Sequence, residues 1–197
     1  MNSSVKSVIK KVKKKIDKKR LKHSFKVAET AEKLAVSEDV NPEKAYLAGI
    51  LHDYAKSVDK GKLKKLAAKS LWEIDRYEYL IPEVLHAPVG AYLVKKEFSI
   101  KDKQILEAIR FHTIGSPKMD KLAKIIFISD IIEPNRKFSG IEQIRKSVKI
   151  NLDKGIIKAC NHAIKYNIEK KRLLHPNTIE LRNKLLKEDG DGEKSQE

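Results

Sequence analysis

Hydrophobic residues recur along this chain three and four positions apart, which is the spacing of an amphipathic helix. The first such stripe consists of Val5, Val8, Ile9, Val12 and Ile16, with lysines between them. We expect this stripe to dock a first helix on the core; the alternative is a helix lying on an anionic membrane surface. Because no segment alternates convincingly with a period of two, the pattern predicts an all-α fold.

The same spacing predicts a series of helices along the rest of the chain. They are expected over about 18–36, from 42 into the stretch 47–60, and over about 61–69, 71–80, 87–98, 101–113, 119–132, 141–170 and 176–187. Asn41 is the expected N-cap before Pro42, because proline fits the first helical turn. A break in the long late helix is expected near Asp153-Lys154-Gly155. We expect one domain over residues 1–186 and a disordered tail over 187–197, which lacks apolar residues.

The composition narrows the class of protein. With 197 residues, 41% of them hydrophobic, the chain can bury a core as one compact domain. The single cysteine, Cys160, excludes a disulfide framework and fits a reducing compartment. No apolar run approaches the roughly 20 residues of a membrane span, and the N-terminus lacks the apolar core of a signal peptide. We therefore expect a soluble, cytoplasmic protein that does not bind membranes.

The net charge of +16 is large for a chain of this length. One interpretation is an anionic partner, such as a nucleic acid, a nucleotide or a membrane surface. The other is a lysine-rich surface with no such role, since the lysines are spread over many segments and only residues 10–22 form a dense block. The charge alone does not decide between these interpretations.

Polar side chains interrupt the apolar faces of several predicted helices. They are His23, His52, His86, His112 and Asp130, and Asp53 lies beside His52. A single inward histidine is usually a hydrogen-bonded core residue and a single inward aspartate a cap or salt-bridge partner, but such explanations must here be repeated for five polar groups. Burying carboxylates without partners is unfavourable, and a bound cation would explain the whole set. Imidazole and carboxylate are ligands for iron, manganese, cobalt or zinc.

Six motifs on these segments make the chain similar to a known family. A histidine, a His-Asp pair about thirty residues later and a distant aspartate resemble the HD superfamily of metal-dependent phosphohydrolases. Within it the chain resembles the YqeK family over about residues 6–186. The motifs are HSFKVAETAEKLA, LAGILHDYAK, LHAPVGAYLV, AIRFHTIGSPKM, IIFISDIIEPNR and LLHPNT. The resemblance implies an HD-domain helical bundle that hydrolyses diadenosine tetraphosphate symmetrically to two ADP.

The resemblance also implies an iron centre. The residues that match the family's iron ligands are His23, His52, Asp53 and Asp130. Where a second ion sits beside the first, Asp53 would bridge the two, and His86 and His112 would be added ligands. Manganese or cobalt are expected substitutes for iron. A metal lowers the pKa of its water from 15.7 toward about 7, so metal-bound hydroxide would attack the phosphorus at the central bridge.

Nucleotide contacts and catalytic roles follow from the same resemblance. The nucleotide contacts map onto His23, Lys56, His86, His112, Thr113, Asp130, Arg136, Leu173, Leu174, His175, Pro176, Asn177 and Thr178. Catalytic roles map onto Asp53, Lys56, His86, His112 and Arg136. Lys56 would clamp phosphate one helical turn beyond His52, and the planar fork of Arg136 suits bidentate phosphate binding. Where they are not metal ligands, His86 and His112 are free to contact phosphate or to protonate the leaving phosphate, and the sequence leaves this choice open.

Two other functions stay open on the sequence. One is an HD phosphohydrolase acting on a guanosine alarmone or a nucleoside phosphate. The other is a nucleic-acid-binding protein with a vestigial site, which the positive charge suggests but the complete ligand set and the lack of a nucleic-acid-binding motif disfavour. The expected partners are therefore a small dinucleoside polyphosphate and its product ADP, with a GDP analogue as an alternative. A homodimer formed through apolar helix faces is left open.

Overall fold

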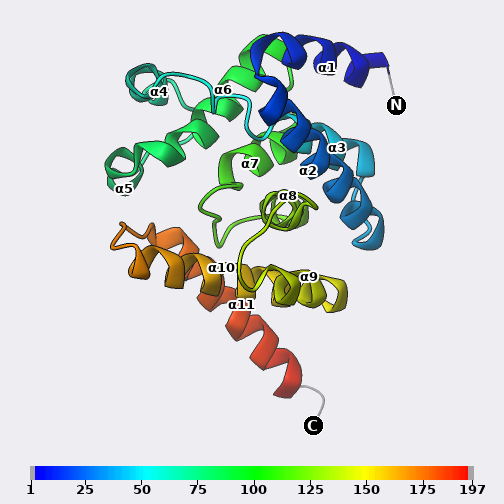
Figure 1. Cartoon of the computed structure of the whole chain (residues 1–197), viewed down its shortest axis with the longest axis vertical. Coiled ribbons are helices and arrows are strands. Elements are labelled where there is room, and N and C mark those ends of the chain that lie inside the picture. Colours follow the sequence, from blue (N-terminus) through cyan, green and yellow to red (C-terminus); the bar gives the residue numbers. More distant parts are fainter. Residues whose placement is uncertain (1–2, 195–197) are drawn as a thin grey trace.

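Helices joined by short connections form the part of the chain that the computed structural model describes, residues 3–194, and no strand occurs among these residues (Figure 1). They are α1 (Ser3–Lys15), α2 (Lys18–Ser37), α3 (Pro42–Leu51), α4 (Lys60–Ala67), α5 (Arg76–Leu80), the 3₁₀ turn η1 (Pro82–Leu85), α6 (His86–Phe98), α7 (Lys103–Phe111), α8 (Lys121–Ile132), α9 (Ile141–Ile150), α10 (Leu152–Glu169) and α11 (Pro176–Lys194). The predicted all-α fold is confirmed. The bounds of α4, α6, α7 and α8 lie within about two residues of the predicted ranges.

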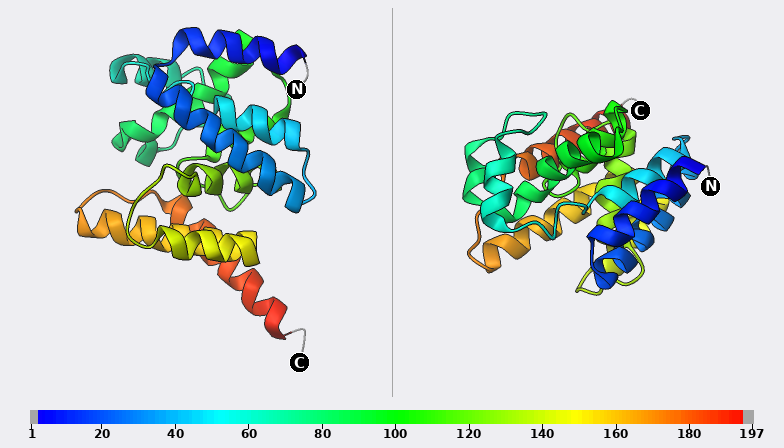
Figure 2. Two further views of the ribbon diagram at one scale, coloured as in Figure 1. Left: turned by 45° about the vertical axis from the view of Figure 1, so that its right-hand side comes forward. Right: turned by 90° about the horizontal axis from the view of Figure 1, so that it is seen from above.

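The helices are arranged along the long axis of the molecule. Figures 1 and 2 show α1 and the α2–α3 pair toward one end and α9 to α11 at the other, with α7 and α8 between them. Helix α8 packs against α2, α3 and α7 on one side and against α9 and α10 on the other. The central helices therefore hold both ends of the fold together.

The first helix docks on the core as the sequence predicts. Val5, Val12 and Ile16 are buried, and Val8 and Ile9 pack against the core while partly exposed. The apolar stripe is therefore already covered by the protein itself. None of the helices within residues 3–194 combines the length and the apolar character needed to span a membrane.

Helices α2 and α3 approach closely at a glycine. A Cβ atom added to Gly49 would lie 2.6 Å from the Cα atom of Ala28, which is backbone and cannot move aside. The N-caps of the two helices, Asp17 and Asn41, accept hydrogen bonds from the backbone N–H groups of Arg20 and Lys44 at 2.9 and 3.0 Å. Gly49 thus sets the spacing between two helices that carry predicted site residues, and the N-caps fix where each helix begins.

The predicted break in the long late helix lies elsewhere. Asn151 separates α9 from α10 with an extended backbone, φ −158° and ψ 133°, and its side chain accepts a hydrogen bond from the N–H of Lys154 at 2.9 Å. The segment Asp153-Lys154-Gly155 is helical instead. Gly155 serves the packing of the two helices, because a Cβ there would lie 2.3 Å from Cγ2 of Val148.

Two further boundaries differ from the sequence-based expectation. Helix α5 begins only at Arg76, because Asp75 and Glu78 form a capping box that starts the helix there rather than at 71. Helix α11 continues to Lys194, although a disordered tail is expected from 187. Lys154 of α10 pairs with Asp189 of α11 at 3.4 Å, which ties this charged turn to the fold. The rest of the expected tail, residues 195–197, lies outside the described residues.

Candidate metal centre

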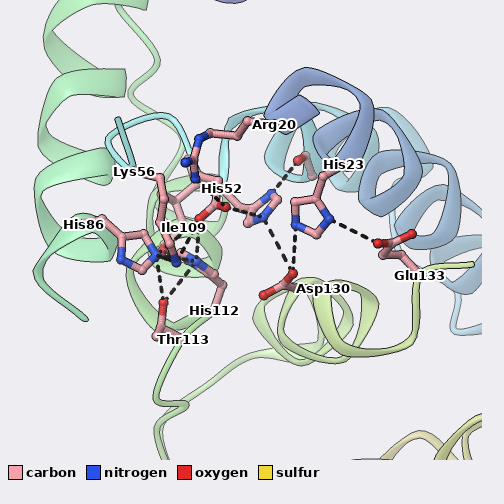
Figure 3. Close-up of polar contacts among 12 residues, drawn as sticks. Arg20, His23, His52, Lys56, His86, Ile109, His112, Thr113, Asp130 and Glu133 are labelled. Carbon is pink, nitrogen blue, oxygen red and sulfur yellow. Dashed lines mark hydrogen bonds and ion pairs between the residues drawn. The ribbon is translucent and has the colours of Figure 1, made fainter. Parts of the chain in front are cut away.

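Six polar side chains, carried on or just after five helices, lie within contact distance of one another. They are His23 on α2, His52 and Asp53 just after α3, His86 at the start of α6, His112 just after α7, and Asp130 in the last turn of α8. Figure 3 labels the four histidines and Asp130 of this cluster. The sequence predicts that these groups point inward. The structure adds that they face one another, which periodicity alone could not show.

The four residues of the predicted metal site form the first part of this cluster. Nε2 of His23 lies 3.0 Å from Oδ1 of Asp130. Nε2 of His52 lies 4.0 Å from the same oxygen and 3.7 Å from Oδ2 of Asp53. Ligand atoms of His23, His52 and Asp130 all lie within 4.8 Å of one another. A single cation is small enough to contact all of them.

Backbone hydrogen bonds fix the orientation of three imidazoles. In each, Nδ1–H donates to the carbonyl oxygen three residues earlier, at 2.7 Å for His52, 2.6 Å for His86 and 2.8 Å for His112. A carbonyl oxygen can only accept, so Nδ1 carries the proton and Nε2 presents its lone pair to the cluster. This arrangement is typical of histidines that ligate metals.

His86 and His112 form the second part of the cluster. Their Nε2 atoms lie 3.1 Å apart, and Oδ1 of Asp53 lies 3.2 Å from the first and 3.5 Å from the second. The ammonium of Lys56 lies 3.1 Å from Nε2 of His86, and the hydroxyl of Thr113 lies 3.0 Å from Nε2 of His112. Three acceptor atoms therefore face one another at a point where positive charge is stabilising.

Burial sets the charge state of the imidazoles. It lowers the pKa of His52 and of His86 to about 4, so both rings are neutral at pH 7, the form that binds metals. Burial also acts to lower the pKa of His23, but the hydrogen bond and charge of Asp130 outweigh it and raise that pKa. The pKa of His23 is therefore shifted in the opposite direction to the pKa values of His52 and His86, because the carboxylate of Asp130 outweighs burial at His23.

The two aspartates remain ionised despite their burial. Burial alone would raise the pKa of Asp53, but His52, His86 and His112 around it hold that pKa well below its ordinary value. The pKa of Asp130 is lowered in the same way by His23, with further contributions from His52 and Arg136. The cluster thus combines neutral nitrogen ligands with anionic oxygen ligands.

Two buried atoms of the cluster indicate that its nitrogen and oxygen donors fit a metal ion. Nε2 of His52 and Oδ1 of Asp53 are buried and have no hydrogen-bond partner within the described residues. Buried polar atoms without partners are rare and unfavourable, so each calls for an explanation. A cation of the imidazole- and carboxylate-binding type, such as iron, manganese, cobalt or zinc, would satisfy both atoms at once.

Sequence reasoning missed two residues that contact the cluster. Glu133 is buried, and its carboxylate accepts hydrogen bonds from Nδ1–H of His23 at 3.3 Å and from the N–H of Asn135 at 2.7 Å. Arg20 places Nη1 3.6 Å from Oδ2 of Asp53. Arg20 lies one helical turn before His23, which is the signal that could have found it.

A cleft of about 610 Å³ opens beside the cluster, next to His23 and Asp53. Its lining includes Arg20, His23, Asp53, Lys56 and Arg136. Arg136 donates from Nε to the carbonyl oxygen of Asp130 at 2.9 Å and from Nη2 to its carboxylate at 2.5 Å. The predicted phosphate-binding residues Lys56 and Arg136 therefore both line the cleft beside the predicted metal ligands.

The predicted nucleotide segment Leu173–Thr178 lies beside the chain that follows Thr113. The hydroxyl of Thr178 donates to the carbonyl oxygen of Ile114 at 2.8 Å. Leu174 lies just before α11, and Pro176 and Asn177 are its first two residues. Within residues 3–194, no hydrogen bond or ion pair joins this segment to the His–Asp cluster. The structure therefore brings the segment near the site, and its role in binding nucleotide stays a prediction.

A second group of potential metal ligands occurs at Asp75, Glu78 and His175. Nε2 of His175 lies 2.9 Å from Oδ2 of Asp75, and Glu78 forms a buried ion pair of 2.8 Å with Arg110. The guanidinium already neutralises Glu78, so this group fits a cation less well than the central cluster does. It explains instead how α5 and α7 hold the start of α11.

Comparison with known proteins gives concordant matches. The family model of the HD domain matches residues 20–135. The chain is 43% identical to a symmetrical bis(5'-nucleosyl)-tetraphosphatase of Halalkalibacterium halodurans, over 86% of this chain and 90% of that protein. It is 37% identical to the enzyme of the same name from Bacillus subtilis, over 83% and 88% of the two chains.

A solved structure has the same fold. It is described as a predicted HD superfamily hydrolase involved in NAD metabolism from Clostridium acetobutylicum, and it superposes with a TM-score of 0.89. The two sequences are 37% identical, and the match covers 93% of this chain and 97% of that one. The similarity therefore extends over the helices at both ends of the molecule as well as over the central cluster.

Proposed function

Because the chain belongs to the HD domain family and matches symmetrical bis(5'-nucleosyl)-tetraphosphatases over most of its length, we propose that it hydrolyses diadenosine tetraphosphate at the central bridge to give two ADP. It is a metal-dependent phosphoanhydride hydrolase. The observation that carries the proposal is the convergence of His23, His52, Asp53 and Asp130, in which Nε2 of His52 and Oδ1 of Asp53 are buried without a hydrogen-bond partner among the described residues. These are the four residues that the HD pattern picks out in the sequence.

The four residues His23, His52, Asp53 and Asp130 would hold the metal. Two imidazoles and two carboxylates suit iron, with manganese or cobalt as substitutes. A metal in this position supplies Lewis acidity and lowers the pKa of water. The contacts of Oδ1 of Asp53 with His86 and His112 support a second ion on that side of the cluster.

Cationic side chains of the protein would bind the negatively charged phosphates. Lys56 reaches Asp53 and His86 with its ammonium while 40% of its side chain stays exposed, so it can turn toward a bound phosphate. Arg136 is held against Asp130 and lines the cleft, and its remaining N–H groups are free to donate to a phosphate there. Cationic donors of this kind stabilise negative charge on phosphate oxygens in the transition state.

His86, His112 and Thr113 form a polar wall on the other side of Lys56. Because Nδ1 of each histidine donates to the backbone, only Nε2 is available to a metal or to a proton shared with phosphate. The hydroxyl of Thr113 lies 3.2 and 3.0 Å from these two nitrogen atoms and can donate to one of them or to a phosphate oxygen. This geometry favours the role of ligand or phosphate contact over that of a free proton donor.

The remaining partners follow from the substrate. A dinucleoside polyphosphate is a small molecule, and its adenosine would contact the segment Leu173–Thr178, with ADP as the product and a GDP analogue as a competing ligand. The single buried thiol, Cys160, supports a cytoplasmic location. Nucleic acid is not an expected partner, and a homodimer stays open.

Product analysis tests the proposal. Purified protein is incubated with diadenosine tetraphosphate, with and without a chelator, and the chelated sample is then resupplied with iron, manganese or cobalt. We expect ADP as the sole product, its loss on chelation and its return with one of the metals. ATP plus AMP would contradict cleavage at the central bridge. Turnover of a guanosine alarmone but not of diadenosine tetraphosphate would point to another nucleotide.

A further inference from the structure

The cleft beside the metal centre is cationic on the side formed by α2. Lys19, Arg20 and Lys22, in the first turns of α2, line it together with Lys56 and Arg136 from the far wall. In the view of Figure 3, Arg20 lies on the opposite side of the cluster from Thr113. The predicted nucleotide segment, Leu173–Thr178, adjoins the Thr113 side. The metal centre therefore has the cationic cleft on its α2 side and the predicted nucleotide segment on its Thr113 side.

The carboxylates in the cleft are already engaged by the protein. Asp17 caps α2 and contacts Arg20 at 3.5 Å, and Glu133 accepts hydrogen bonds from His23 and from the backbone. Asp53 belongs to the metal centre. Among the residues that the structure describes, these contacts leave Lys19 and Lys22 without a carboxylate partner.

Lys19 and Lys22 differ from the other cations in having nothing to pair with. Arg20, Lys56 and Arg136 each contact an aspartate. Lys19 and Lys22 are exposed, and over residues 3–194 neither ammonium has an ion pair or a hydrogen bond. Two free ammonium groups in a cleft beside a phosphate-cleaving centre provide binding sites for an anionic ligand.

A symmetrical substrate has one nucleoside diphosphate on each side of the cleaved bond, and each half needs its own binding site. One ADP half would lie toward Thr113 and Leu173–Thr178, and the other half must leave in the opposite direction. Among the described residues, no phenylalanine, tyrosine or tryptophan lines the cleft formed with α2, which we call the α2 cleft. The cleft thus offers charge for phosphates but no aromatic ring on which a base could stack.

We propose that the α2 cleft is the subsite for the second nucleoside diphosphate, the leaving ADP, and that Lys19 and Lys22 bind its phosphates. This inference rests on the proposed function, because it places the second half of that substrate. The subsite would bind the leaving ADP through the positive charges of Lys19 and Lys22. It would also favour substrates that carry two phosphates beyond the cleaved bond over those that carry one.

A pair of double variants tests the subsite. K19A/K22A removes the two free ammonium groups, and K18A/K33A removes the same charge from exposed positions of α2 that do not line the cleft. We expect K19A/K22A to raise KM for diadenosine tetraphosphate about tenfold, with kcat within about twofold of wild type and a weaker dependence of KM on salt. K18A/K33A should keep the KM of the wild-type protein. Circular dichroism checks that both variants fold.

Calorimetric titration of the manganese-loaded protein with ADP gives a second readout. Wild type should bind two ADP per chain, and K19A/K22A should weaken one of the two sites. A KM for K19A/K22A equal to that of K18A/K33A, or one ADP per chain in wild type, would overturn the subsite while leaving the proposed function intact. Failure of wild type to cleave diadenosine tetraphosphate would instead overturn the proposed function.

Discussion

The Nε2 atoms of His86 and His112 lie 3.1 Å apart, although each ring already donates its Nδ1–H to a backbone carbonyl. Two nitrogen lone pairs are therefore directed at the same small volume, with a carboxylate oxygen of Asp53 beside them. Such an arrangement is stable when a cation or a shared proton lies among the three atoms. It shows that the site extends beyond the His23, His52, Asp53 and Asp130 quartet.

Removing a ligand should remove the metal. We expect Asp53→Asn and His52→Ala to abolish turnover and to lower the metal content of the purified protein, because each deletes a donor that no neighbour replaces. Elemental analysis and turnover are measured on the same preparations. His162→Gln on α10 is the matched control and should keep both properties. An Asp53→Asn protein with full metal and full activity would refute the ligand assignment.

Lys56 should act on phosphate rather than on metal. Lys56→Ala removes an ammonium 3.6 Å from Oδ1 of Asp53, and we expect kcat to fall by about 100-fold, the effect of losing one donor to a charged transition state. The metal content should stay that of wild type, because an ammonium cannot be a ligand. Loss of metal from Lys56→Ala would show that the side chain stabilises the site itself.

Glu133 should tune the metal affinity through His23. Its carboxylate accepts the Nδ1–H of His23, which fixes the ring with Nε2 toward Asp130. We expect Glu133→Ala to weaken metal binding by roughly 10- to 100-fold, as outer partners of metal-bound histidines do. Competition with a metal-binding dye measures this affinity. Glu133→Gln, whose amide oxygen can still accept the hydrogen bond, should lose less, and an equal loss in both variants would argue against this role.

The metal-free protein should lose stability as the pH falls from 6.5 toward 4. In this window the unfolded chain protonates His52 and His86, whereas the folded chain, with both pKa values lowered to about 4, does not. Each imidazole then contributes a loss of about 1–2 kcal/mol by pH 5, and the raised pKa of His23 offsets part of it. Thermal unfolding of chelator-treated protein at pH 7 and pH 5 measures the effect. An unchanged or higher Tm at pH 5 would contradict it.

The close approach of α2 and α3 should tolerate no larger residue. Gly49→Ala would place Cβ 2.6 Å from the backbone of Ala28, and we expect a loss of about 1–3 kcal/mol in the free energy of unfolding. Gly90→Ala is the control, because its Cβ would meet no atom closer than 3.5 Å. Urea unfolding compares the two. If Gly49→Ala were as stable as Gly90→Ala, the contact would not set the spacing of the helices.

Much of the site could be predicted because buried polar groups interrupt apolar helix faces. His52 and His112 each follow a run of inward residues at helical spacing, so their direction follows from periodicity. Their mutual contact depends on how α3 and α7 pack, which one sequence does not encode locally. The HD resemblance supplied the grouping that periodicity could not.

The residues that were missed share a physical cause. Arg20 lies within a block of lysines, where a cation that contacts Asp53 looks like any solvated one. Glu133 precedes Pro134 and looks like the end of a helix, yet its side chain is buried against His23. Asn151 breaks the late helix through one extended residue, a signal weaker than the neighbouring glycine. In each case the deciding contact is distant in sequence or confined to one residue.

The location of the metal tests the central claim most directly. Crystals of the manganese-loaded protein, measured near the manganese absorption edge, would reveal the ion by its anomalous scattering. The account predicts a peak in contact with Nε2 of His52 and with carboxylate oxygens of Asp53 and Asp130. A peak at Asp75, Glu78 and His175, with none at the central cluster of an active preparation, would contradict it.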